Sequence, residues 1–499
     1  MPDSADSADS DVCLIVEGAY PFVIGGVSNW LQDLVLSMPD LRFSLVAIKA
    51  GSMEQPWRMT PPPNVVEVVE VPLLIEPFLP RRYPAPQMKR IGRLLLAFLS
   101  TGGKDDLIRL RQEIGKLNPP PAAGDLLSNP EIFDLFTHYY EKAFRSASFH
   151  HFFWAMRVLL GGLLKMLLAP LPRARVYHTI STGFAGLLAA RAAYETGKPA
   201  FITEHGIYML ERQIEIMMAD WIGDQIETGL TLDREGHDLR DLWLAVFQTY
   251  TRACYDACDP IIALYGANNQ TQRRLGARQE RLRVIPNGIE ADRFCHIERM
   301  GDPARPLVAL IGRVVPIKDV KTFVRAAGFV LAEMPEVRFA ILGPMDEDPD
   351  YAADCKALVK ELGIGNAVQF AGRVQVAEWL PRIDLLVLTS LSEAQPLVIL
   401  EGGACGVPVV APDVGSCREM IEGRSPDVDR PGGIVTELVN PEGTAAAILR
   451  LLRAPSLRRA MGEALRDRVV KDYDRRAIIA EYRHIYSMLG AQARFSELQ

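Results

Sequence analysis

The sequence of 499 residues has no excess of positive charge and no cysteine framework. Lysine and arginine total 55 against 62 aspartate and glutamate residues, which gives a net charge of -7. Nucleic-acid-binding proteins usually carry a basic surface, so we expect no nucleic-acid partner. The seven cysteines are odd in number and scattered, as is typical of reduced thiols in a cytosolic protein. Cys254 and Cys258 share a helical face, but no second Cys/His pair lies at ligand spacing, and we predict no metal site.

The sequence also has no secretory start and no uninterrupted apolar run of membrane-spanning length. Residues 1–10 are acidic and repetitive, without the basic and apolar regions of a signal peptide, and we expect them to form a disordered tail. The most apolar stretch, 154–171, contains Arg157, Lys165 and Pro170, whereas a spanning helix needs about 20 apolar residues with few charges. We expect a buried or partner-facing amphipathic helix there, in a cytoplasmic protein.

The composition is that of a folded chain with large cores. Apolar residues make up 48% and charged residues 23% of the sequence, which excludes a mainly disordered protein. Short apolar runs alternate with helical patterns, and this alternation predicts an α/β fold with parallel sheets. The predicted strands are 12–16, 43–48, 65–71, 176–180, 200–203, 260–263 and 282–285 in the first half, and 307–311, 338–342, 368–370, 385–389 and 407–411 in the second.

The pattern predicts two Rossmann-like domains of unequal size. A polar linker at 300–306 separates a first domain, 11–302, from a second, 303–475, and a helix at 476–499 is expected to pack back on the first. A block without strands, about 86–169, is expected to be a helical insertion with helices at 87–99, 105–117, 130–146 and 152–168. A ligand should bind in the cleft outside the carboxyl ends of the strands.

The glycines of the first domain do not form the dinucleotide fingerprint. Neither half has G-x-G-x-x-G after its first strand, which weakens a nicotinamide or flavin hypothesis. Gly25 and Gly26 follow the first strand and precede a helix, so they form either an ordinary turn or a phosphate cradle. His205 follows the predicted strand 200–203 and is either a structural histidine or a donor to a ligand hydroxyl.

The second domain opens with two cations in the loop after its first strand. Arg313 and Lys318 could clamp a diphosphate, one through a planar fork and one as a point charge, or could be solvated surface groups. Glu393 follows strand 385–389, and Glu401 lies eight residues later in an apolar helix that begins near Pro396. A carboxylate in that setting needs a partner, and a ribose diol offers two hydroxyl donors.

These motifs, in this order, resemble those of retaining glycosyltransferases of family 4, which have the GT-B fold. The motifs are Gly25-Gly26, Glu204-His205-Gly206, Ile285-Pro286-Asn287-Gly288, Gly312-Arg313 with Lys318, and Glu393 followed eight residues later by Glu401. Several strings also resemble the PelF-like subgroup, the glycosyltransferases of Pel exopolysaccharide biosynthesis, a biofilm polymer. They lie at 17–21, 203–208, 343–351 and 392–397.

The resemblance implies a role for each matching residue. The first domain would bind the acceptor and the second the nucleotide sugar, with Arg313 and Lys318 neutralising the leaving diphosphate. Glu393 would meet the donor sugar and Glu401 the ribose, while His205 would contact the sugar. The remaining nucleotide-sugar-binding positions implied by the resemblance are Gly25, Gly26, Asn287, Arg373 (at the base), Gln395, Pro396 and Leu397. Ala394-Gln395-Pro396 replaces the Gly-Phe-Gly that is usual in the family, which leaves the sugar-facing contact open.

The implied activity is a retaining hexosyl transfer from a UDP-sugar such as UDP-glucose to a growing polysaccharide. No aspartate motif of the metal-dependent transferases is evident, so we expect no metal or other cofactor. Implied partners are inner-membrane synthase or export subunits, through which the protein would lie peripherally at that membrane. The alternatives are a sugar-nucleotide epimerase, a glycogen-synthase-like transferase, and a nucleotide-binding assembly subunit without catalysis. A phosphorylase is disfavoured by length.

Overall fold

The structure is a computed structural model that describes residues 10–49, 56–74, 81–145, 147–218, 239–424 and 430–497. The chain divides into two compact units. The first comprises residues 1–263, 268–283 and 482–499, and the second comprises 264–267 and 284–481. The division thus lies at 283–284, whereas the sequence pattern predicted the change of domain at 302–303. The expected tail, 1–10, lies outside the described residues except for Ser10, which begins a strand.

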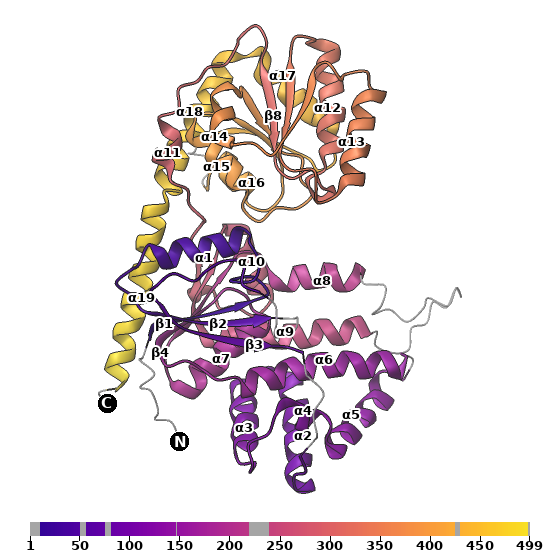
Figure 1. The fold of residues 1–499 in the computed structure, drawn as a ribbon, viewed down its shortest axis with the longest axis vertical. Coiled ribbons are helices and arrows are strands. Elements are labelled where there is room, and N and C mark those ends of the chain that lie inside the picture. The colour runs from indigo at the N-terminus through magenta and orange to yellow at the C-terminus, as the bar shows by residue number, and fades with distance from the viewer. Residues whose placement is uncertain are drawn as a thin grey trace. The chain divides into compact units, whose positions relative to one another are not determined.

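The first unit is built on a seven-stranded sheet in the order β3-β2-β1-β4-β5-β6-β7. Figure 1 labels the first four of these strands, β1 to β4. Every residue of β2 is buried, as expected for a parallel strand covered by helices on both faces. The strands are β1 (Ser10–Glu17), β2 (Phe43–Lys49), β3 (Val65–Pro72), β4 (Ala174–Thr179), β5 (Ala200–Glu204), β6 (Cys258–Ala263) and β7 (Leu282–Val284). The helices outside the insertion are α1 (Gly26–Leu36), α7 (Phe184–Thr196), α8 (Tyr208–Met218), α9 (Leu239–Ala257) and α10 (Gly266–Arg274, which begins in the second unit).

The helical insertion is present and belongs to the core of the first unit. Its helices are α2 (Ala85–Thr101), α3 (Lys104–Gly115), α4 (Ala123–Leu127), α5 (Pro130–Ala143) and α6 (Phe149–Leu168). Within this unit α6 packs against α7 and α9, and α7 packs on the strands, so the insertion is joined to the sheet by shared apolar contacts. Asn129 caps α5 by accepting a hydrogen bond from the Glu131 amide at 3.0 Å, and Pro130 occupies the first helical position.

One helix among the described residues, α6, is long and apolar enough to cross a membrane. Its most apolar 18-residue window has a mean hydropathy of 1.4, and 61% of that window is buried inside the unit. The same length and composition are found in core helices of proteins that do not cross membranes, and the buried share indicates such a helix here.

The second unit is built on a six-stranded parallel sheet in the order β10-β9-β8-β11-β12-β13. One apolar cluster covers each face of the sheet, so the strands are buried on both sides. The strands are β8 (Leu307–Ile311), β9 (Arg338–Leu342), β10 (Val368–Gly372), β11 (Leu385–Val387), β12 (Val409–Pro412) and β13 (Gly433–Thr436). The helices are α11 (Ala291–Cys295), α12 (Val320–Glu333), α13 (Pro349–Glu361), α14 (Val376–Trp379), α15 (Leu397–Ala404), α16 (Cys417–Glu422), α17 (Pro441–Arg453) and α18 (Pro455–Asp472).

The last helix, α19 (Arg475–Glu497), belongs to both units because the division falls between its residues 481 and 482. Its second part is anchored in the first unit by a buried polar chain. The Tyr486 hydroxyl is 2.8 Å from Nδ1 of His178, and Nε2 of His178 is 3.0 Å from the Thr203 hydroxyl. Thr203 in turn lies 3.2 Å from the Tyr482 hydroxyl. Burial lowers the pKa of His178 to about 3, so the imidazole is neutral and both its nitrogens are used in hydrogen bonds.

Replacement of Tyr486 tests this anchor. Tyr486→Phe keeps the ring but leaves Nδ1 of His178 without its partner in the core, and we expect a loss of about 1–3 kcal/mol in the free energy of unfolding. The matched control is Tyr194→Phe, because that hydroxyl bonds the exposed Asp256 carboxylate at 3.1 Å; we expect a change within about 0.5 kcal/mol. Urea denaturation of both variants measures the difference. Equal losses would show that the buried bond contributes nothing specific.

Candidate active site

Three predicted site residues of the second unit, Arg313, Lys318 and Glu393, follow β8 and β11, which lie side by side in the sheet. These strands are neighbours in the sheet without being consecutive in the chain, so their carboxyl ends form the switch point at which parallel sheets bind ligands. Arg313 follows β8, and Lys318 ends a single turn at Pro316–Lys318. Glu393 lies in the loop after β11, and its Oε1 is 2.5 Å from the Lys318 Nζ.

The Lys318–Glu393 pair is mostly shielded from solvent. The Lys318 side chain is 22% exposed and that of Glu393 is 11% exposed. Hydrogen bonds to the segment after β11 hold the lysine loop in place, because the Thr389 hydroxyl donates to the carbonyls of Lys318 and Asp319 at 3.1 and 2.9 Å. The Leu391 amide donates to the Ile317 carbonyl at 2.8 Å. The charged pair therefore rests on two rigidly joined loops.

The loop after β8 packs closely against Gly343, a position where a side chain would not fit. A Cβ at Gly343 would lie 1.9 Å from the carbonyl oxygen of Gly312, so any other residue there would displace the backbone that precedes Arg313. Asp319 then takes a left-handed conformation, φ 42°, and caps α12 by accepting from the Thr322 amide at 3.3 Å. The turn that presents Arg313 and Lys318 is thus fixed at both ends.

The two predicted arginines are on the surface and face acidic side chains that follow β9. The Arg313 guanidinium is 2.6 Å from Glu347, with both side chains about half exposed. Arg373, just after β10, is 3.9 Å from Asp346, and both are more than three-quarters exposed. An exposed ion pair contributes at most about 1 kcal/mol to the free energy of folding. An anionic ligand can therefore replace the carboxylate beside either arginine at little energetic cost.

Glu401 lies in α15, and no residue that the structure describes pairs with its carboxylate. Within the described part of the chain its carboxylate makes no hydrogen bond or ion pair, and burial raises its pKa while Arg293 opposes the rise. A partly buried carboxylate without a partner is unfavourable unless a ligand supplies donors.

The side chain of Gln395 is used within the protein. Its Oε1 accepts from the Asn287 amide at 2.8 Å and its Nε2 donates to the Asn287 carbonyl at 3.0 Å. The two predicted binding positions are therefore joined, and Asn287 keeps a buried Oδ1 that has no protein partner among the described residues. Pro396 caps α15, and Leu397 begins the helix with 39% of its surface exposed. These positions can meet a ligand through the main chain and the Asn287 side chain.

The first unit carries the other predicted residues. Gly25 caps α1 in an extended conformation, and a Cβ at Gly25 or Gly26 would meet no atom within 4 Å, so open space lies in front of this helix N-terminus. His205 follows β5 and is 9% exposed; its Nε2 has no protein partner in the described part of the chain. The Trp30 ring from α1 packs edge-on against the His205 imidazole, with the ring centroids 4.4 Å apart.

Two carboxylates at the strand ends of the first unit were not predicted as site residues. Glu17 ends β1 and accepts from the Ala185 amide at 3.1 Å and from the Tyr208 hydroxyl at 3.0 Å. Glu204 ends β5; it accepts from Tyr255 at 2.6 Å, and burial raises its pKa to about 7. Both belong to strings that carry the family resemblance, 17–21 and 203–208. Each lies at the carboxyl end of a buried strand, the edge at which parallel sheets bind ligands.

The cysteine pair considered as a possible metal site is a buried thiol contact. Sγ of Cys254 and Sγ of Cys258 are 3.8 Å apart, and both residues are buried. Across the described ranges, no group of three or more His, Cys, Asp or Glu side chains is arranged to hold a metal ion.

Two parallel-sheet Rossmann-like units define the GT-B class of glycosyltransferase folds, and the predicted fold class is confirmed. Sucrose-phosphate synthase from Thermosynechococcus elongatus has this fold, with a TM-score of 0.57 at 16% identity over 96% of this chain and 99% of that one. Anabaena Alr3699/HepE, solved with UDP, matches with the same TM-score at 14% identity over the same shares.

The chain belongs to the family described as "Domain of unknown function (DUF3492)", whose model matches residues 10–280, and residues 305–454 match the model "Glycosyl transferases group 1". The resemblance to glycosyltransferases is thereby confirmed at this level. Curated relatives are D-inositol 3-phosphate glycosyltransferases. That of Thermobispora bispora is 28% identical over 57% of this chain and 70% of its own length. That of Catenulispora acidiphila is 31% identical over 42% of this chain and 51% of its own.

His205 gives a pH prediction. Burial lowers its pKa from 6.5 to about 4, so the folded protein holds it neutral. The folded pKa lies below the ordinary value; its contribution to stability is therefore complete above pH 6.5 and is lost as the pH falls from 6.5 towards 4. We expect the His205 imidazole resonance, assigned by its loss in His205→Gln, to stay constant between pH 8 and about 5.5. A titration midpoint near 6.5 would contradict the buried, unpaired state.

Proposed function

We propose that the protein is a retaining, metal-independent hexosyltransferase that moves a sugar from a UDP-sugar to a growing polysaccharide of the Pel type. The observation that carries this proposal is the Lys318–Glu393 pair at the β8/β11 switch point, with Arg313 in the loop that leads to Lys318 and α15 beginning four residues after Glu393. Cations beside a helix N-terminus provide positive charge for a diphosphate, and a carboxylate beside them can accept from sugar hydroxyls.

Lys318 and Arg313 would stabilise the leaving group. In the proposed step the bond from the anomeric carbon to the diphosphate breaks, and the acceptor hydroxyl oxygen bonds to the same face of that carbon. The hydroxyl proton passes to the departing phosphate, so no separate base is needed. The negative charge that develops on the diphosphate is greatest in the transition state, where fixed cations have their largest effect.

The partner that Glu401 lacks in the described part of the protein would be the nucleotide ribose. Two ribose hydroxyls can both donate to one carboxylate, which would compensate its partial burial. Arg373 would meet the base, and Asn287, Gln395, Pro396 and Leu397 the rest of the nucleotide sugar. From the first unit, Gly25 and Gly26 would approach the diphosphate through their amides, and the unpartnered His205 Nε2 would face the sugar.

The donor and acceptor classes rest on different support. The Anabaena protein was solved with UDP and with UDP-glucose, which favours a uridine donor here. The polysaccharide acceptor, the PelF-like identity and the membrane synthase partners rest on the strings at 17–21, 203–208, 343–351 and 392–397. The curated relatives act on an inositol phosphate by name, so a small phosphorylated polyol is the competing acceptor.

Calorimetric titration with UDP, ADP and GDP tests the donor site, and turnover of UDP-glucose with a polysaccharide acceptor or an inositol phosphate tests the reaction. We expect a preference for UDP, product with the same anomeric configuration by NMR, and undiminished turnover in EDTA. Preference for ADP would favour a glycogen-synthase-like enzyme, and equal binding of all three would overturn the site. Turnover of the sugar nucleotide without an acceptor would favour an epimerase.

Three variants separate the roles. Glu401→Gln should weaken UDP binding about tenfold or more, because a charged hydrogen bond contributes about 1.5–3 kcal/mol. Lys318→Gln should lower kcat by about 100-fold or more with a smaller effect on UDP affinity. Arg325→Gln, an exposed cation on α12, is the control and should change neither. If Glu401→Ala abolishes nucleotide binding while polymer synthesis continues, the protein is an assembly subunit and not the transferase.

A further inference from the structure

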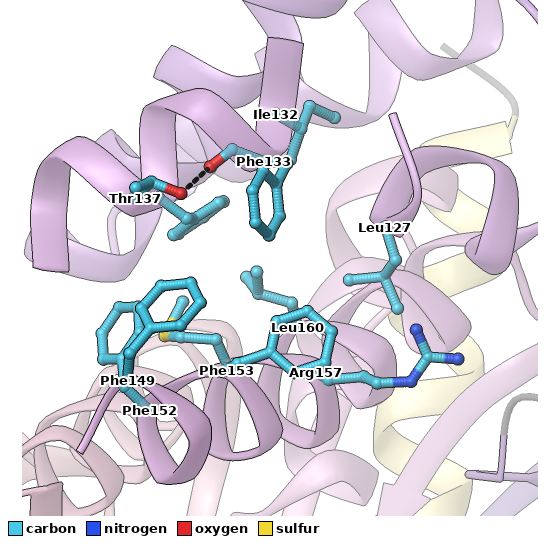
Figure 2. A pocket seen from close by; sticks show the side chains of 11 residues that line it. Leu127, Ile132, Phe133, Thr137, Phe149, Phe152, Phe153, Arg157 and Leu160 are labelled. Atoms are coloured by element: carbon cyan, nitrogen blue, oxygen red, sulfur yellow. Dashed lines mark hydrogen bonds between the residues drawn. The ribbon is translucent and has the colours of Figure 1, made fainter. Parts of the chain in front are cut away.

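The helical insertion contains an apolar pocket and none of the predicted site residues. Figure 2 shows the pocket between α5 and α6, with aromatic rings on both sides and the Arg157 guanidinium at its edge. Its cavity volume is about 40 Å³, and its one charged lining side chain is Arg157. The lining residues are Leu127, Ile132, Phe133, Phe136, Thr137, Phe149, Phe152, Phe153, Met156, Arg157 and Leu160.

Six residues of α5 and α6 are here called the aromatic face: Phe133, Phe149, Phe153 and Arg157, which line the pocket, and Trp154 and Val158, which lie on α6 beside them in the sequence. Four of them are strongly exposed: Phe133 at 41%, Phe149 at 40%, Trp154 at 50% and Val158 at 52%. Ring contacts join the aromatic members, because Phe133 lies 6.4 Å from Phe149 and 6.3 Å from Phe153, and Trp154 lies 5.6 Å from Phe153, centroid to centroid. A contiguous exposed patch of this kind marks an interaction site.

The charge of α6 is of one sign, although the chain as a whole is acidic. Its 20 residues contain Arg157 and Lys165 and no aspartate or glutamate. Arg157 has no carboxylate partner among the described residues, and its guanidinium lies over the Trp154 ring at 5.9 Å. The exposed acids of α5, Asp134 and Glu141, do not line the pocket. The aromatic face thus combines rings with an unpaired cation.

We propose that the aromatic face docks on a lipid bilayer that carries anionic headgroups, with the end of an acyl chain entering the pocket. Tryptophan and arginine side chains suit this position, since each has an apolar or flat body and a polar end that stays at the headgroups. An acid-free helix with aromatic and basic side chains has the composition of an interfacial helix. Because 61% of its apolar window is buried in the unit, α6 would lie along the membrane surface without leaving the fold.

The charge pattern favours lipid over a second copy of the chain. A two-fold contact through the aromatic face would bury the Arg157 of each copy in an apolar interface, and no described acid of this face would pair with either. An anionic headgroup provides the missing partner for Arg157, while an acyl chain fills the ring-lined cavity beside it. Both parts of an anionic lipid therefore have a matching part of the surface.

Flotation with vesicles tests the proposal with the full chain. Vesicles of phosphatidylcholine alone are compared with a two-to-one mixture of phosphatidylcholine and phosphatidylglycerol. We expect binding to the mixture, weakening as salt is raised. Arg157→Gln should lower the affinity for these vesicles about fivefold, which is the effect of one cation near an anionic surface. Phe149→Ala should lower it about tenfold, because an exposed ring no longer enters the bilayer. A blue shift of tryptophan emission on binding should disappear in Trp154→Phe.

Matched controls lie on α12 of the second unit. Arg325→Gln removes one exposed cation, and Phe329→Ala removes a ring that is 45% exposed; both should bind vesicles as the parent does. No binding to the mixture at low salt, or equal losses in the controls, would overturn the proposal. So would a concentration-dependent dimer in sedimentation that Phe149→Ala abolishes, because the face would then bind a second copy. The affinity of each variant for UDP should equal that of the parent protein. A failure of the membrane proposal can therefore be distinguished from a failure of the proposed function.

Discussion

Parallel pairing of β8 with β11 is the constraint on which the candidate site of the second unit depends. It places the ends of two strands, which are about 75 residues apart in the chain, at adjacent positions on one edge of the sheet. Lys318 and Glu393 can meet only because of that pairing, and the Thr389 hydroxyl then fixes the distance between their loops. A change in the register of either strand would separate the charges.

The same pair explains how the site can remain ordered without a ligand. A shielded lysine without a carboxylate, or the reverse, would leave a poorly solvated charge. Here each neutralises the other, whereas Arg313 and Arg373 are exposed and pair only weakly with Glu347 and Asp346. A diphosphate would exchange these contacts for its own, so its net binding energy is the difference between two paired states. Glu401 differs, because the protein offers it no partner in the described residues.

Periodicity predicted most elements of the fold, because buried parallel strands and long amphipathic helices leave strong patterns. Twelve short apolar runs were identified as strands, and each corresponds to a strand in one of the two sheets. β13 was missed because it is only four residues long and its apolar signal is limited to Ile434 and Val435, between Gly433 and Thr436. Helix α4, with five residues, is too short for a period of 3.6 to be visible. The Gln395–Asn287 contact could not be predicted at all, since it joins loops 108 residues apart through one side-chain amide. The sequence likewise identified the residue types of the candidate site, but not which of them already have partners within the protein.

The continuity of α19 has a consequence for how such a protein can be rearranged. The chain passes from the first unit to the second at 283–284 and returns within this helix, so the first unit consists of separate stretches of sequence. A chain shortened to end before residue 482 would lose Tyr482 and Tyr486 and uncover His178, which is otherwise sealed in the core. The second unit therefore cannot be exchanged by replacing every residue after 283. A fusion or recombination that replaces it must keep the final turns of the helix with the half that precedes it.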